Sequence, residues 1–129
     1  MIEAQQQKLV IVADDEPPPR RFLEDSLLEL GYAVQSVDHP SKIERIGDCL
    51  ALIMDIRFPP DRFLGLDYVI QKRESGELPA KTLVIFITNF TKEAPSPKRL
   101  QRAGYHVVLY KPLEITAIRK RLAAAEAQS

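Results

Sequence analysis

The fold is set by the stretch Leu9-Val10-Ile11-Val12-Ala13-Asp14-Asp15-Glu16-Pro17, in which an apolar run ends in acidic residues. A solidly apolar run of this length is typical of a strand that is buried on both faces of a sheet. The prolines from Pro17 to Pro19 suit the entrance of a helix, where a missing N–H group costs little. The stretch therefore predicts a strand, a polar turn and a helix in direct succession.

The same succession recurs along the chain. Besides residues 9–12, strands are predicted at residues 32–37, 50–54, 82–87 and 107–110. Apolar residues at helical spacing predict helices at residues 17–30, 66–75 and 113–125, with a short helix at best at 41–46. Ser96 as N-cap and Pro97 at the first helical position predict another short helix, which ends at Ala103. Five strands interleaved with five helices predict an α/β protein, a flavodoxin-like doubly wound (βα)5 three-layer sandwich with a parallel five-stranded sheet of order 2-1-3-4-5.

Size and composition narrow the class of protein. The chain has 129 residues, which predicts one domain over residues 1–129 with a core at about 8–125. The 18 basic and 18 acidic residues balance, so we expect no direct binding of nucleic acid. No apolar run reaches the roughly 18 residues of a membrane span, so we expect no membrane insertion. Cys49 is the only cysteine, and a chain without a possible internal disulfide is expected in the cytoplasm.

Polar residues suited to phosphate and metal chemistry follow four of the predicted strands. They are Asp14 and Asp15, then Asp55, then Thr88, and finally Lys111 before Pro112. The carboxyl ends of parallel strands border the ligand crevice of such a sheet, so these side chains should meet. Two carboxylates about 4 Å apart repel by roughly 4 kcal/mol at an effective dielectric near 20, so three of them require a cation. Oxygen ligands with room for water suit Mg²⁺.

The other strand-end residues suit a phosphoryl group. Asp55 is the candidate nucleophile, since carboxylates can attack phosphorus to form an aspartyl phosphate. Lys111 would hold one phosphoryl oxygen as a point charge, and the Thr88 hydroxyl would donate to another.

The ordered set resembles the receiver domain of bacterial two-component response regulators, including chemotaxis receivers, from Lys8 to about Ala125. The paired acids and their extension match Asp14-Asp15-Glu16-Pro17, and the phosphoacceptor position matches Asp55. The switch hydroxyl matches Thr88, and the Lys-Pro pair after the fifth strand matches Lys111-Pro112.

The resemblance implies a site and a set of partners. Asp15 and Asp55 would give carboxylates to Mg²⁺, with Asp14 closing the site and the backbone carbonyl of Arg57 as a further ligand. Phosphate would come from a sensor histidine kinase or a histidine phosphotransfer protein. Thr88 would then move toward the phosphoryl group and alter a surface that binds a downstream protein or a fused output domain. The domain would assist its own phosphorylation and dephosphorylation without being an enzyme for other substrates.

The sequence departs from the family pattern near the switch. The position three before the lysine, often aromatic in the family, is Val108, and the residue after the hydroxyl, usually small, is Asn89. These departures favour an alternative, a receiver-like interaction module that works without phosphorylation. A second alternative is a phosphohydrolase with Asp55 as nucleophile, but Arg57 stands where such enzymes need a general acid. A further hypothesis places Arg57 and Phe90 beside the phosphoryl group, where the apolar Phe90 would slow phosphate loss.

Overall fold

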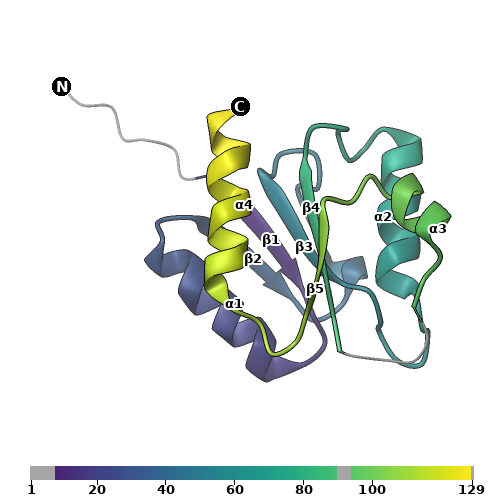
Figure 1. Ribbon diagram of the computed structural model, residues 1–129, viewed down its shortest axis with the longest axis horizontal. Helices are drawn as coiled ribbons and strands as arrows, with labels where there is room; N and C mark the ends of the chain where they lie inside the picture. Colours follow the sequence, from purple (N-terminus) through teal and green to yellow (C-terminus); the bar gives the residue numbers. More distant parts are fainter. Residues whose placement is uncertain (1–7, 90–93, 129) are drawn as a thin grey trace.

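The computed structural model describes residues 8–89 and 94–128, and the described chain forms one parallel five-stranded sheet with helices on both faces (Figure 1). The strand order is β2-β1-β3-β4-β5, which confirms the predicted flavodoxin-like topology. The strands are β1 (Leu9–Ala13), β2 (Ala33–Val37), β3 (Ala51–Asp55), β4 (Leu83–Thr88) and β5 (Val107–Tyr110).

The helices form the two outer layers. They are α1 (Pro17–Glu29), α2 (Leu64–Ser75), α3 (Pro97–Arg102) and α4 (Ile115–Ala127). Figure 1 shows α1 and α4 on one face of the sheet and α2 and α3 on the other. Each face carries its own apolar cluster, because the central strands are buried on both sides. Leu23 and Leu27 of α1 belong to one cluster, and Leu66 and Val69 of α2 belong to the other.

The expectation of five helices is wrong for the described residues, which form four α-helices and one 3-10 helix, η1 (Pro40–Lys42). The segment 41–46, predicted to be a short helix at best, is helical only up to Lys42. Ile43 is extended, and Arg45 adopts a left-handed conformation with φ of 60°. Ile43 and Ile46 are thereby placed to pack against the core. Burial of these two side chains outweighs a weak helical pattern.

The register of the sheet positions the candidate site. Ala13 of β1 pairs with Met54 of β3, so Asp14 and Asp55, which follow them, lie side by side at the carboxyl edge. Thr88 pairs with Tyr110 at the ends of β4 and β5, and Lys111 follows directly. The four polar stretches thus reach one edge of the sheet, as predicted. Among the described residues, no helix is long and apolar enough to cross a membrane.

Candidate functional site

Three carboxylates from two neighbouring strand ends form the floor of the site. Asp14 is fully buried and Asp55 is 3% exposed, whereas Asp15 lies nearer the surface. One oxygen from each of the three lies within 4.8 Å of the others. Burial and the neighbouring Asp14 charge raise the pKa of Asp15, which is the response expected of crowded carboxylates.

Local turns hold both buried aspartates in place. The Glu16 backbone N–H donates to Oδ1 of Asp14 at 2.9 Å, and the Arg57 N–H donates to Oδ1 of Asp55 at 3.1 Å. Both are short loop turns of the kind that aspartate favours. The second oxygen of Asp14 is buried and receives no hydrogen bond. A buried carboxylate oxygen without a donor, beside two further carboxylates, is suited to coordinate a hard divalent cation.

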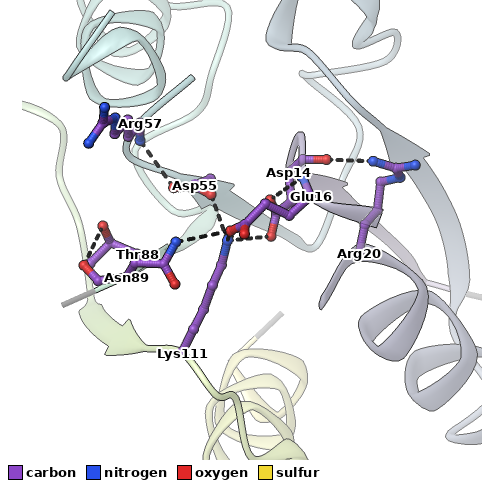
Figure 2. A network of polar contacts seen from close by, with 8 residues as sticks. All are labelled: Asp14, Glu16, Arg20, Asp55, Arg57, Thr88, Asn89 and Lys111. Carbon is purple, nitrogen blue, oxygen red and sulfur yellow. Dashed lines mark hydrogen bonds and ion pairs between the residues drawn. The ribbon is translucent and has the colours of Figure 1, made fainter. Parts of the chain in front are cut away.

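Lys111 joins the strand ends electrostatically. Its Nζ lies 2.8 Å from Oδ2 of Asp55 and 3.2 Å from Oδ1 of Asp14, and it also contacts the Glu16 carboxylate (Figure 2). The lysine side chain is only 7% exposed. Oδ2 of Asp14 lies 3.0 Å from Nζ as well, but without the geometry of a hydrogen bond. One cation therefore offsets part of a surplus of negative charge.

The pKa values of Asp55 and Lys111 are both raised, which disfavours the charged form of Asp55 and favours the charged form of Lys111. Burial raises the pKa of Asp55, although contact with Lys111 works in the other direction. Burial alone would lower the pKa of Lys111, but contacts with Asp55, Glu16 and Asp14 together outweigh it and raise that pKa. A raised lysine pKa keeps the ammonium charged at neutral pH. Lys111 does not neutralise all of the buried negative charge of the carboxylates, and a further cation bound between them would reduce the cost of burying it.

Sequence reasoning missed Glu16 and Asn89 as members of this network. Glu16 is the N-cap residue of α1 but makes no side-chain cap. Its carboxylate instead contacts Lys111 and accepts a hydrogen bond from Nδ2 of Asn89 at 3.0 Å, as Figure 2 shows. The signal that could have found Glu16 was its place at the same strand end as Asp14 and Asp15.

Thr88 lies beside the site, but its hydroxyl is turned away from the acids. Its Oγ1 donates to the carbonyl of Asn89 at 3.2 Å, while its backbone carbonyl accepts from the Lys111 N–H at 2.9 Å. The structure therefore places Thr88 beside Lys111 through the backbone. Arg57 is exposed, and its side chain extends away from Asp55 in Figure 2. Phe90, the other residue predicted to lie beside the phosphoryl group, is outside the described residues.

A hollow of about 90 Å³ opens next to Thr88. Val108 lines it together with Thr88, Phe63 and Leu100. Val108 is the position at which the resemblance implies an aromatic ring, and here its smaller side chain is partly buried at the wall of the hollow.

Comparisons with known proteins support the fold. No protein-family model matches the sequence, and no curated protein sequence matches it. Among solved structures, many response regulator receiver and CheY-like domains share the fold over most of the chain. The described chain therefore has the receiver-domain architecture, with the candidate site at the carboxyl edge of its sheet.

Three of these structures illustrate the likeness. The response regulator StyR has a TM-score of 0.78 and 23% identity, with 93% of this chain and 59% of that chain covered. This chain thus spans little more than half of the StyR structure. A CheY-like receiver domain from Methanospirillum hungatei JF-1 has a TM-score of 0.74 and 17% identity, covering 96% of this chain and 100% of its own. The response regulator TrrA from Thermotoga maritima, solved in complex with Mg²⁺-BeF, has a TM-score of 0.72 and 20% identity, covering 92% of this chain and 99% of its own.

Proposed function

We propose that this chain is a phosphoacceptor receiver domain of a two-component or phosphorelay system, with Asp55 as the residue that is phosphorylated. The observation that carries the proposal is the grouping of Asp14, Asp15 and Asp55 within 4.8 Å, with Lys111 against two of them, at the carboxyl edge of a receiver fold. A structural role alone gives no reason for three carboxylates to share so small a space, since their repulsion is costly.

The chemistry divides among the residues of the site. A carboxylate oxygen of Asp55 would attack the phosphorus of a phosphohistidine on a sensor kinase or phosphotransfer protein. The P–N bond would break, and its electron pair would leave with the imidazole. Lys111 would hold a phosphoryl oxygen, and the Thr88 hydroxyl would rotate from the Asn89 carbonyl to donate to another.

The donor set of the site fits Mg²⁺. Asp14, Asp15 and Asp55 would hold the ion, with the backbone carbonyl of Arg57 as a further ligand, and the bound ion would supply charge neutralisation for the phosphoryl group. The product of the reaction would be an altered surface for a downstream protein or a fused output domain. We place the domain in the cytoplasm, where a lone buried cysteine such as Cys49 stays reduced.

Phosphorylation can be tested directly. The protein is incubated with acetyl phosphate and millimolar MgCl₂, and its intact mass is compared with that of Asp55→Asn. We expect the wild type to gain the mass of one phosphoryl group, the variant to gain none, and hydroxylamine to remove the adduct, since it cleaves acyl phosphates. An adduct that survives hydroxylamine, or that forms on the variant, would overturn the proposal.

One observation favours the second candidate, a receiver-like module that works without phosphorylation. Glu16 already contacts the lysine that a phosphoryl group would need, so the site is internally paired without phosphate. Absence of an adduct in the same experiment, with a folded protein, would favour this module.

A further inference from the structure

Lys111 has no hydrogen-bonding capacity to spare. A lysine ammonium has three N–H donors, and here Asp14, Asp55 and Glu16 each accept from it. A phosphoryl group on Asp55 can therefore pair with Lys111 only by replacing one of these acceptors. The aspartate side chains are at most 5% exposed, whereas the Glu16 side chain is 44% exposed. Glu16 is the acceptor that water can replace at the lowest cost.

Glu16 is tied on its other side to the end of β4. The oxygen that accepts from Lys111, Oε1, also accepts from Nδ2 of Asn89 at 3.0 Å. Asn89 follows Thr88 directly, and Figure 2 shows its amide directed toward Glu16 and Lys111. The contact of Glu16 with Lys111 lowers the pKa of Glu16, with a smaller contribution from Asn89. One carboxylate thus connects the start of α1 to the ends of β4 and β5.

We propose that Glu16 and Asn89 form a latch over the site that opens when Asp55 is phosphorylated. The inference rests on the proposed function and assigns a regulatory role to two residues of the same site. The phosphoryl group takes the Lys111 donor from Glu16, and Glu16 moves out toward solvent. Asn89 then loses its hydrogen bond to Glu16, so the conformation at the end of β4 changes in response to the phosphoryl charge. This route needs neither an aromatic side chain at Val108 nor a movement of the Thr88 hydroxyl.

The latch should slow phosphorylation, because the Glu16 carboxylate occupies one N–H of Lys111 and repels an anionic phosphodonor. Glu16→Gln removes the charge and keeps the side-chain length, so adduct formation should accelerate about threefold. Asn89→Ala removes only a neutral hydrogen bond to Glu16, so its acceleration should be smaller. The double variant should match Glu16→Gln, because Asn89 acts through Glu16 and coupled residues are not additive.

Rates of adduct formation by intact mass test this scheme, with Glu29→Gln as the charge control. Glu29 is exposed at the end of α1, and its substitution changes net charge equally without touching the site. The control should react at the wild-type rate. Equal rates for wild type, Glu16→Gln and Asn89→Ala would overturn the latch. A full additional acceleration by Asn89→Ala in the Glu16→Gln background would also overturn it, because Asn89 would then act as a steric plug.

A second measurement reads the latch itself. The side-chain amide resonance of Asn89 in a ¹H–¹⁵N spectrum should shift in Glu16→Gln without any donor, and in the wild type on phosphorylation. If the wild type gains its adduct while this resonance stays fixed, the latch is overturned and the proposed function stands. If the Asn89 resonance does not shift in Glu16→Gln, the latch is overturned before any phosphodonor is added. If neither wild type nor variants gain an adduct, the proposed function falls and the latch falls with it.

Discussion

Gly65 lies against Asp55 so closely that a β-carbon on Gly65 would stand 1.8 Å from the carbonyl oxygen of Asp55. The Gly65 N–H also donates to the carbonyl of Ile56 at 3.0 Å. The first turn of α2 is therefore seated directly on the end of β3, the strand that presents the candidate phosphoacceptor. Real β-carbons do not approach a backbone oxygen at this distance, so only glycine fits without a shift of the backbone.

Gly65→Ala should strongly destabilise the protein. Either α2 or the end of β3 must move to admit the methyl group, and we expect a loss of about 3 kcal/mol in the free energy of unfolding, measured in urea. Gly76→Ala is the matched control, since Gly76 has a φ of 82° but open space around its β position. Its left-handed backbone alone should cost about 1 kcal/mol. Equal losses in the two variants would contradict the close approach.

Arg73 should be a major structural residue of the α2 face. Its guanidinium donates to the backbone carbonyls of Ala103, Thr82 and Gly104 at 2.8 to 2.9 Å, and also to that of Pro79. Lysine cannot reproduce this fork, so Arg73→Lys should lower the free energy of unfolding by about 2 kcal/mol. Arg102→Lys, in an exposed pair with Glu74, should change it little. A stable Arg73→Lys protein would show that the carbonyls find other donors.

Asp55→Asn should stabilise the unphosphorylated protein. Burial raises the pKa of Asp55 to about 7, so its charged form opposes folding. The folded state then binds more protons than the unfolded state between pH 4 and 7, and this contribution to stability is lost as pH rises through that window. The variant lacks this loss, so its advantage should grow from acid to neutral pH, with an upper limit of about 4 kcal/mol from the rise in pKa from 3.8 to about 7. Urea unfolding at pH 4.5 and 7.5 measures it; an advantage larger at pH 4.5 would contradict the raised pKa.

Mg²⁺ should raise the midpoint of thermal unfolding. An ion that binds only the folded state stabilises it by about 1.4 kcal/mol at ten times its dissociation constant. Protons compete for the same carboxylates, because the pKa values of Asp15 and Asp55 are raised, so the effect should shrink as pH falls below neutral. Asp14→Asn should lose most of it, and NaCl of equal ionic strength should not reproduce it. The same response to MgCl₂ and NaCl would contradict a specific site.

The strands and their order could be predicted because β1, β3 and β4 are buried apolar runs and the partly buried edge strand β5 is still an apolar run. The run predicted at 50–54 is β3 at Ala51–Asp55, and the run at 107–110 is β5 without change. Ser96 caps α3 through the Arg99 N–H as its sequence position indicated. Residues 41–46 were predicted poorly, because their conformation follows from packing of Ile43 and Ile46 against a distant core.

The sequence by itself determined which polar side chains arrive at the carboxyl edge of the sheet, since each follows an apolar run typical of a strand. Asp14, Asp15, Asp55, Thr88 and Lys111 were all found in this way. Only the tertiary structure decided which of them touch. The third N–H of Lys111 donates to Glu16, the Thr88 hydroxyl donates to the carbonyl of Asn89, and Gly65 packs against the backbone of Asp55. Such contacts depend on side-chain orientation and on how the strand ends and helices pack together, which local periodicity does not encode.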